Sequence, residues 1–591
     1  MNLNAKKKSF VKSLPKSFPK SFAERNKIIF LCFLFFSLIL IVRLFLVQVI
    51  NSDLYADRAN KQYFTPASSV FKRGNIFFQK KNGELISGAM QIDGFKLAIN
   101  PNKIGNPEEF YKKLLKKINS GGLDQINLDF NKEEFLAKAK NKKRTYVEIF
   151  NNLSKKEIDI IMDEKIPGVT VYKEKWRFYP GNNLASHVLG FVGYIGDELA
   201  GRYGLEKKYN KELSRDKDNP YVNFFAEVFS NLKNGKQNGD IVMSIEPIVQ
   251  NFLEKKMLEV KEKYQIDSIG GIIMNPKNGA IYAMGVQPDF DLNNFSKVKD
   301  ISLLGNPLVE NVFEFGSVVK PLIMAAGLDT VVITAETTYD DKGFVIVDKR
   351  IINNFDKKKR GIINMQEVLG KSLNTGMHFV YQKLGKDIMR DYMLSYGIKD
   401  KTGIDLPNET NSLISNLYGS KDLEYVNATF GQGIALTPVA LIRALASLAN
   451  GGNLVTPHII EKISFNDIIE EKKEYPIIPT KISKKTSEEI TRMLVNVMDK
   501  YFKSGSMKLE NHSIAVKTGT AQIAKENGGG YEEDKYTHAI VGYFPAYNPD
   551  FIILIYAVNP KDVSYSITTL SQPFLDTVKF LINYYEVKPD R

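Results

Sequence analysis

A long apolar segment near the N-terminus constrains this chain most, because it separates two compartments. Residues 28–50 read IIFLCFLFFSLILIVRLFLVQVI. About 20 apolar residues, each rising ~1.5 Å in a helix, span a hydrocarbon core of roughly 30 Å. The segment is longer than the core of a signal peptide, and no small-x-small cleavage site follows it. We therefore expect an uncleaved transmembrane signal anchor, with Arg43 reaching outward from its outer end.

The charges on either side of this segment predict its orientation. Residues 1–27 carry eight basic side chains and one acidic side chain, and such basic flanks stay in the cytoplasm. Everything after residue 50 is then exported. This tail carries +7 of the formal net charge of +14. The positive charge therefore does not indicate a nucleic-acid domain, because such a domain concentrates its charge on a folded face.

The cysteine content limits the chemistry of the exported part. The single cysteine, Cys32, lies inside the predicted anchor. The exported part therefore forms no disulfide of its own and has no thiol nucleophile. Its stability has to come from burial of an apolar core, which its length permits.

A change in the pattern of apolar and charged residues divides the exported part into two domains. The boundary rests on the polar segment 232–239, rich in Gly, Asn and Lys. The chain is thus expected to comprise a cytoplasmic basic tail (1–27), the anchor (28–50), a first exported domain (51–235) and a second exported domain (236–591). In the first exported domain, short strands alternate with charged helices. We expect helices at 111–117 and 155–163, and strands at 169–172 and 188–192.

The second exported domain begins and ends with strands. We expect strands at 241–245, 270–274, 280–284, 512–522, 538–545 and 551–558. Between them lie long helical patterns around 318–330, 365–384, 437–450 and 486–501, and a further helix closes the chain near 571–585. Strands at both ends with helices between predict one antiparallel sheet covered by helices, an α+β fold.

Three short motifs in this domain carry the chemistry. They are Ser317-Val-Val-Lys320, Ser372-Leu-Asn374 and Lys517-Thr518-Gly519-Thr520. Together and in this order they are the motif set of serine β-lactamases and penicillin-binding proteins. None is specific alone, because Ser-x-x-Lys also starts at Ser9, Ser13, Ser17, Ser69, Ser214, Ser230 and Ser296, a second Lys-Thr-Gly occupies 401–403, and a second Ser-x-Asn starts at Ser464.

The sequence around Ser317 favours it over the other serines. Pro321 prevents the following helix from extending a turn upstream, since its ring would clash with the carbonyl four residues back. The helix therefore starts near Ser317, and Lys320 returns to the same face three residues later. An amine in that place can take the proton of a serine hydroxyl. Standing alone, Ser317 would be explained equally well as a plain helix cap.

The other two motifs are also chosen by their flanks. Lys517 follows a strand-like run, whereas Lys401 stands in a turn-like setting and is interpreted as structural. Ser372 lies in a polar break of the helical pattern 365–384, which is either a solvated end or a way to bring polar groups into a cleft. Ser464 is discounted because it is expected in a strand-to-helix turn beside charged residues.

With these motifs the chain resembles the class B penicillin-binding proteins, the peptidoglycan D,D-transpeptidases, over nearly its whole length. Residues 312–321, VFEFGSVVKP, are very similar to that family's nucleophile segment, which more often has threonine at position 318. Residues 430–433, FGQG, match another family phrase, and 177–193 look like part of its membrane-proximal pedestal. Residues 79–83, QKKNG, depart from the family's Asp-Arg-Asn-Gly phrase, away from the chemistry.

The resemblance implies a transmembrane helix, an elongated α/β pedestal domain of the dimerisation type, and a penicilloyl-serine transferase domain of the β-lactamase and transpeptidase fold. Ser317 would attack the penultimate D-Ala carbonyl of a stem peptide and release the terminal D-Ala, with Lys320 as base and Ser372 as proton relay. Burial and a nearby second cation would lower the pKa of Lys320. The substrate would be bound by Asn374, Lys517, Thr518, Gly519 and Thr520.

Further expectations concern the surroundings of this site. Backbone N–H groups of Ser317 and Thr520 would form an oxyanion hole, and 524–537 is interpreted as a mobile flap over the cleft. The histidines show no zinc spacing, and the Asp289-x-Asp291 phrase lacks the residues of a calcium loop. We therefore expect no metal and no cofactor.

The resemblance also predicts partners and place. Stem peptides ending in D-Ala-D-Ala would be substrates, and β-lactams would be covalent inhibitors. The enzyme would sit in the cytoplasmic (inner) membrane with its catalytic domain outside, beside a multispanning glycan polymerase and division proteins. The phrases around Ser317 and Phe430 look closer to the division (FtsI) branch than to the elongation branch. The alternatives are an elongation enzyme of the same class, a β-lactam sensor, or a silent scaffold of the division complex.

Overall fold

The computed structural model covers the whole chain and describes residues 34–40, 72–120, 131–162, 166–196, 198–215, 239–465, 469–525 and 528–591. The chain forms two units, Met1–Ser69 and Val70–Arg591. In the first unit, 34–40 are helical and exposed. The predicted cytoplasmic tail and most of the predicted anchor lie outside the described residues. Within the described residues, none of the helices has the length and apolar character needed to cross a bilayer.

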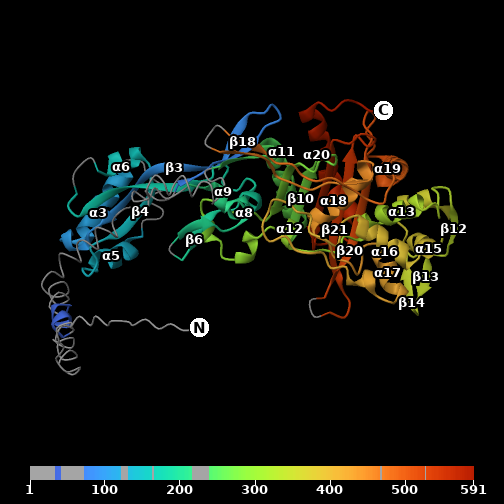
Figure 1. Cartoon of the computed structure of the whole chain (residues 1–591), viewed down its shortest axis with the longest axis horizontal. Coiled ribbons are helices and arrows are strands. Elements are labelled where there is room, and N and C mark those ends of the chain that lie inside the picture. The colour runs from blue at the N-terminus through green and yellow to red at the C-terminus, as the bar shows by residue number, and fades with distance from the viewer. Residues whose placement is uncertain are drawn as a thin grey trace, which may run out of the picture. The chain divides into compact units, whose positions relative to one another are not determined.

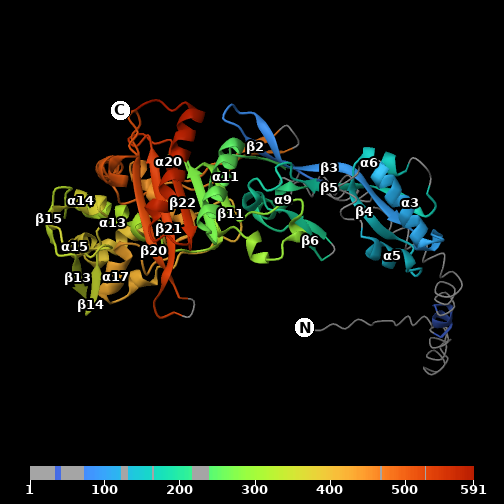
Figure 2. The same ribbon diagram turned by 180° about the vertical axis from the view of Figure 1, so that it is seen from behind.

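A five-stranded antiparallel sheet organises the C-terminal half (Figures 1 and 2). Its order is β11 (Ile281–Gln287), β10 (Ser268–Met274), β22 (Phe551–Val558), β21 (Tyr531–Phe544) and β20 (Ala515–Ala524). Strand β22 is buried on both faces, which explains its unbroken apolar sequence. Since strands from both ends of the domain pair in register, the predicted antiparallel sheet is confirmed.

Helices cover both faces of this sheet. The helices α11 (Pro247–Tyr264) and α20 (Ser566–Tyr585) pack together on it, with the rings of Phe252 and Phe580 stacked 3.9 Å apart. The helices α13 (Lys320–Asp329), α18 (Pro438–Ala449) and α19 (Lys484–Asn496) form a second helical layer.

The predicted pattern 365–384 is two helices, α14 (Met365–Gly370) and α15 (Asn374–Leu384), so the polar break ends one helix and begins another. Further helices are α16 (Lys386–Ser395) and α17 (Asp422–Thr429), and the small hairpins are β12 (Thr338–Asp341) with β15 (Gly361–Asn364) and β13 (Phe344–Val347) with β14 (Arg350–Asn353).

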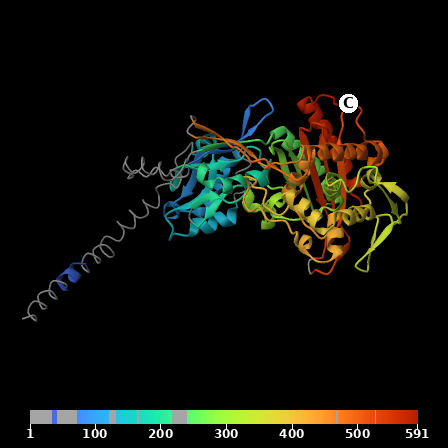
Figure 3. The same cartoon turned by 45° about the vertical axis from the view of Figure 1, so that its right-hand side comes forward.

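A second sheet joins the two predicted exported domains (Figure 3). Its order is β18 (Ile469–Lys472), β17 (Ile460–Phe465), β9 (Gly239–Met243), β2 (Ile76–Gln79), β3 (Leu85–Ile99) and β4 (Val147–Leu153), with β5 (Val169–Phe178) also on β3. The parallel pair of β2 and β9 aligns Ile76 with Ile241. This sheet therefore contains strands from both sides of residue 235. A separate core lies under α3 (Pro107–Ser120), α5 (Lys132–Lys140) and α6 (Lys155–Ile161).

A buried ion cluster joins strands and helices of the first predicted exported domain. Glu206, on α8 (Gly204–Lys208), is fully buried and pairs with Arg73 of β1 (Lys72–Arg73) and Arg177 of β5. The guanidinium groups also donate to the carbonyl oxygens of Glu206 and Gly74. Burial alone raises the pKa of Glu206, but the two guanidinium groups outweigh it and hold that pKa below its ordinary value.

Two local predictions were wrong. Residues 188–189 of the predicted strand 188–192 end the short helix α7 (Ser186–Leu189), and only Val192 belongs to a strand, β6 (Val192–Ile195). Residues 188–192 are buried all round, and a short buried apolar run does not distinguish the two structures. Ser464 does not precede a helix: it lies within β17, opposite Glu470 of β18. The charged residues beside it belong to the outer strand of that hairpin.

Candidate active site

Ser317 stands at the start of a helix, as predicted. A 3-10 turn, Gly316–Val319, leads directly into α13, with Pro321 near its first position. Ser317 is half-buried, and its neighbours Gly316 and Val318 are buried. The helix start therefore presents one partly accessible hydroxyl at the rim of the core.

The segment before Ser317 is fixed along one side by the FGQG phrase. The backbone N–H of Gly316 donates to the Gly431 carbonyl (3.2 Å), and Phe313 and Leu436 exchange two backbone hydrogen bonds (2.9 Å each). A Cβ on Gly431 would lie 2.2 Å from the Gly316 carbonyl oxygen. Residues 430–433 thus support the Ser317 turn at a distance that only glycine allows.

Strand β20 fixes the same turn from the other side. A Cβ on Gly519 would lie 2.2 Å from the Phe315 carbonyl oxygen and 3.0 Å from the Val318 amide nitrogen. The substrate-binding role of Gly519 stays a prediction. In the structure the Ser317 turn occupies the space beside Gly519. The glycine of Lys-Thr-Gly therefore brings the first and third motifs together.

Ser372 connects the two lysines of the site. It lies between α14 and α15 with φ +56°, an unusual conformation for serine that often marks functional positions. The Lys517 ammonium nitrogen donates to Ser372 Oγ (3.0 Å), and Lys320 Nζ lies 3.3 Å from the same oxygen. All three motifs therefore meet, although Ser317 Oγ has no hydrogen-bond partner among the described residues.

Lys320 is oriented by the second motif. Its Nζ donates to the Ser372 carbonyl (2.6 Å) and to Asn374 Oδ1 (2.8 Å), while Asn374 Nδ2 donates to the Asn353 carbonyl (3.0 Å). A neutral amine has two N–H groups for these two oxygens, which leaves its lone pair for the third contact, the Ser372 hydroxyl at 3.3 Å. Asn374, predicted to hold a substrate amide, is also a support for Lys320.

Both lysines are buried without a counter-ion. Lys320 is fully buried, and burial together with the Lys517 charge lowers its pKa well below the ordinary value. Burial lowers the pKa of Lys517 to about 7. Neither amine pairs with a carboxylate of the described residues. The two causes predicted to lower the pKa of Lys320, burial and a nearby second cation, are thus both present in the structure.

The remaining predicted residues lie along β20. Thr518 and Thr520 are half-buried, and Thr520 Oγ1 lies 3.1 Å from Ser566 Oγ and accepts from the Ser566 backbone N–H (3.1 Å). Ser566 begins α20 and was missed by the sequence interpretation, since a single serine before a helix carries no signal of its own. The carboxylate-binding and oxyanion roles stay predictions.

The second Lys-Thr-Gly is structural in the way predicted. Glu409 accepts from the Thr402 backbone N–H and hydroxyl (2.6 Å each) and from the Gly403 N–H (3.2 Å). The Lys401 side chain is exposed. This motif therefore closes a turn and takes no part in the cluster around Ser372.

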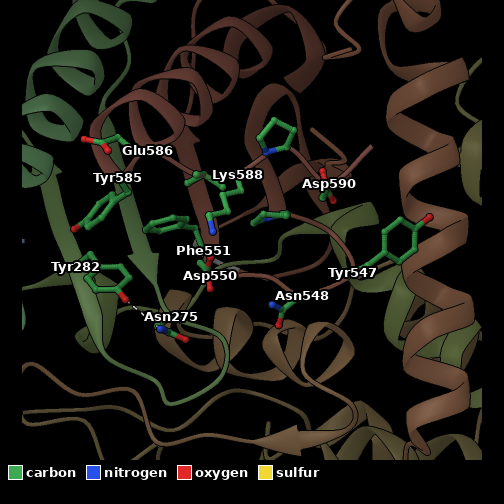
Figure 4. Close-up of a pocket in the computed structure, with 13 residues that line it drawn as sticks. Asn275, Tyr282, Tyr547, Asn548, Asp550, Phe551, Tyr585, Glu586, Lys588 and Asp590 are labelled. Carbon is green, nitrogen blue, oxygen red and sulfur yellow. Dashed lines mark hydrogen bonds between the residues drawn. The ribbon is translucent and has the colours of Figure 1, made fainter. Parts of the chain in front are cut away.

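A separate cleft of about 600 Å³ opens beside the C-terminal segment (Figure 4). Its lining includes the mutually packed rings of Tyr282, Phe551 and Tyr585, and Lys588 lies to one side of them. No residue of the three motifs lines it. Within the described residues, no group of three or more His, Cys, Asp or Glu side chains is placed to hold a metal ion.

Comparisons with known proteins agree with this geometry. Residues 269–578 match the penicillin binding protein transpeptidase domain, and 69–226 match the penicillin-binding protein dimerisation domain. Stage V sporulation protein D of Bacillus subtilis is 28% identical over 527 residues, covering 85% of this chain and 78% of that protein. Peptidoglycan D,D-transpeptidase FtsI of Buchnera aphidicola (strain Bp) is 27% identical, covering 76% and 77%. Peptidoglycan D,D-transpeptidase MrdA of Acinetobacter baumannii is 25% identical, covering 91% and 85%.

Solved structures share the fold. Penicillin binding protein 2X from Streptococcus thermophilus aligns with a TM-score of 0.68 at 19% identity, covering 88% of this chain and 81% of that one. Penicillin binding protein 3 from Mycobacterium tuberculosis, complexed with aztreonam, aligns with a TM-score of 0.66 at 19% identity, covering 88% and 98%. At this identity the likeness concerns the fold alone.

Proposed function

This chain belongs to the class B penicillin-binding proteins and is a peptidoglycan D,D-transpeptidase, and from that premise we propose that Ser317 is the residue it acylates. The observation that carries the proposal is the pair of buried, uncompensated lysines around Ser372. A neutral amine at Lys320 is what a serine nucleophile needs near pH 7, because an ordinary lysine is protonated there.

The reaction runs in two acyl transfers. Lys320 accepts the Ser317 proton as Oγ bonds to the penultimate D-Ala carbonyl carbon. The proton passes through Ser372 to the leaving amine, and the terminal D-Ala departs as its C–N bond breaks. An amine of a neighbouring stem peptide then attacks the ester, which forms the new peptide bond and returns the proton to Ser317.

Substrate binding falls to the polar groups of β20 and α15. Thr518 and Thr520 hold the terminal carboxylate by hydrogen bonds, with the charge of Lys517 behind them. Asn374 holds the substrate amide, and Gly519 keeps β20 against the Ser317 turn. The backbone N–H groups of Ser317 and Thr520 stabilise the oxyanion, where losing one donor typically costs about 10²–10³ in rate.

β-Lactams are the proposed covalent inhibitors, since their strained amide presents a carbonyl to the same hydroxyl. The test is labelling of the full-length protein with a fluorescent penicillin. Ser317→Ala abolishes covalent labelling, and Ser296→Ala, which removes another Ser-x-x-Lys serine, leaves it unchanged. Labelling of Ser317→Ala at the wild-type level would overturn the assignment.

The cellular role and topology complete the proposal. The basic tail (1–27) and anchor (28–50) hold the chain in the inner membrane, the pedestal (51–235) follows, and the transpeptidase domain (236–591) works outside, beside a multispanning glycan polymerase and division proteins. We place the enzyme at the division septum, and relatives include both FtsI and MrdA proteins. A fluorescent fusion tests this: a septal signal supports division, and a lateral signal supports elongation.

A further inference from the structure

Glu314, three residues before Ser317, has a side chain that the proposed chemistry does not use. Its Oε1 accepts from the Gly433 backbone N–H at 3.0 Å. This bond lies between the two backbone contacts that join the Ser317 segment to residues 431–436. Glu314 thus adds a side-chain hydrogen bond to the three backbone hydrogen bonds that join the Ser317 segment to residues 431–436.

The same carboxylate has a second donor from a distant part of the chain. The Tyr531 hydroxyl lies 3.0 Å from Glu314 Oε2 and 3.3 Å from Oε1. Tyr531 is the first residue of β21, opposite Ala524, where the β20–β21 hairpin extends past the five-stranded sheet (Figure 1). The hairpin is therefore tied to the Ser317 segment at its outer end as well as at Gly519.

We propose that Glu314 and Tyr531 form a latch that positions Ser317 for acylation by holding the β20–β21 hairpin against the nucleophile segment. The inference rests on the proposed role of Ser317. Tyr531 and Glu314 are positioning residues, since neither has a hydrogen bond or ion pair with a motif side chain among the described residues.

The burial and charge of the pair suit a latch. Both side chains are half-buried. Burial raises the pKa of Glu314, and its bonds to Tyr531 and Gly433 offset only part of that rise. A partly desolvated carboxylate depends on its donors, and hydrogen bonds to a charged group are about twice as strong as neutral ones. Among the described residues, Tyr531 is the titratable side chain that hydrogen-bonds Glu314.

The geometry also explains why this bond acts on Ser317. The Ser317 turn lies between residues 431–436 and β20, and close backbone packing at Gly431 and Gly519 leaves no space on either side. A shift of the hairpin relative to Glu314 therefore moves the turn or opens that packing. Small displacements of a nucleophile are costly, because acylation requires the reacting atoms within about 3–3.5 Å.

The test compares two tyrosines of the same strand in the full-length protein. Tyr531→Phe removes only the hydroxyl that reaches Glu314. Tyr536→Phe is the matched control, because its hydroxyl bonds the Glu533 carbonyl within the hairpin. Stopped-flow acylation by a fluorescent penicillin separates the affinity of the first complex from the acylation rate constant. We expect Tyr531→Phe to lower the rate constant about tenfold, with affinity within about twofold, and Tyr536→Phe to change neither.

Glu314 variants test the connection itself. Glu314→Ala loses both bonds and should acylate more slowly than Tyr531→Phe, while Glu314→Gln keeps an acceptor oxygen and should recover part of the rate. Adding Tyr531→Phe to Glu314→Ala should cause no further loss, since the shared bond is already gone. Equal losses from Tyr531→Phe and Tyr536→Phe, or additive losses in the double variant, would overturn the latch. Ser317→Ala separates the two proposals: labelling of that variant contradicts the nucleophile, whereas wild-type rates in Tyr531→Phe contradict only the latch.

Discussion

Two clusters of buried cationic side chains differ in their compensation. In the domain that comprises residues 69–226, Arg73 and Arg177 share the carboxylate of Glu206. In the transpeptidase half, Lys320 and Lys517 meet at the neutral hydroxyl of Ser372. Each cluster buries two cations, but only the first contains an anion.

The difference follows from what each side chain does when its charge is costly. A guanidinium does not lose its proton in a protein, so a buried arginine requires a partner charge. An amine escapes the same cost by deprotonation, which yields a base. Compensated burial therefore fixes a fold, and uncompensated burial of lysine prepares chemistry. The choice of Arg in one cluster and Lys in the other is part of the function.

Replacing Lys320 by arginine gives the sharpest contrast, because it puts the chemistry of the first cluster into the second. Lys320→Arg keeps the charge but cannot deprotonate, so we expect acylation by a fluorescent penicillin to fall about 10²–10⁴-fold. The melting temperature should fall too, since an obligate charge is buried without an anion. Lys320→Met should lose the same activity and keep its stability. Acylation by Lys320→Arg at near wild-type rates would exclude Lys320 as the base.

Removing the anion of the first cluster is expected to affect stability and leave chemistry intact. Glu206→Gln leaves two buried guanidinium groups without a counter-charge, and breaking such a group typically costs about 3–5 kcal/mol. Denaturant unfolding measures the loss, and acylation per folded molecule should be unchanged. Glu212→Gln, a half-buried neighbour with no ion pair among the described residues, is the control. A Glu206→Gln protein as stable as wild type would refute the structural role.

Both clusters should make stability rise with pH, but in different pH ranges and for different reasons. Burial lowers the pKa of Lys517, whereas the two guanidinium groups lower the pKa of Glu206. With a pKa of about 7 in the native protein and about 10.4 when unfolded, Lys517 binds fewer protons folded than unfolded. Stability should therefore rise from pH 7 to 9, by up to about 1.4 kcal/mol per pH unit. Lys517→Met should lose the Lys517 share of this rise and keep the share of Lys320, whose pKa burial also lowers. The depressed pKa of Glu206 works at low pH instead: its contribution is present above the unfolded pKa and is lost as the pH falls through the folded one. A wild-type protein with the same pH slope as Lys517→Met would contradict the first half.

The second cluster was predictable from the sequence and the first was not. Ser317, Lys320, Ser372 and Lys517 stand in short motifs whose chemistry is recognisable from residue type and spacing. Arg73 and Glu206 lie 133 residues apart, and nothing near either indicates the other. Their pairing depends on how β1, β5 and α8 pack, which is a property of the tertiary structure.

The same limit explains what the sequence missed around the site. Helix starts and strand runs are local, so the start of α13 near Ser317 and the strand β20 were predicted. The left-handed conformation of Ser372, the bond from Tyr531 to Glu314, and the sheet that joins β2 to β9 are set by distant partners. At 188–192 the local pattern itself was ambiguous, since a buried helical turn and a buried strand have the same apolar composition.

Substitution in the second Lys-Thr-Gly, at 401–403, should have the smallest effect on stability and acylation. It tests whether the three-letter motif alone is enough to predict a role in the site. Lys401 is exposed, and the neighbouring Thr402 and Gly403 serve only the turn closed by Glu409. Lys401→Ala should therefore change the free energy of unfolding by no more than about 0.5 kcal/mol and leave acylation unchanged. Lys517→Ala, the same change in the same three-letter motif, should slow acylation strongly, because Lys517 is buried against Ser372. Parallel measurement of acylation rates and melting temperatures decides the matter. Equal effects of the two substitutions on acylation would show that the burial of the Lys517 amine against Ser372 does not set its role apart from that of the exposed Lys401.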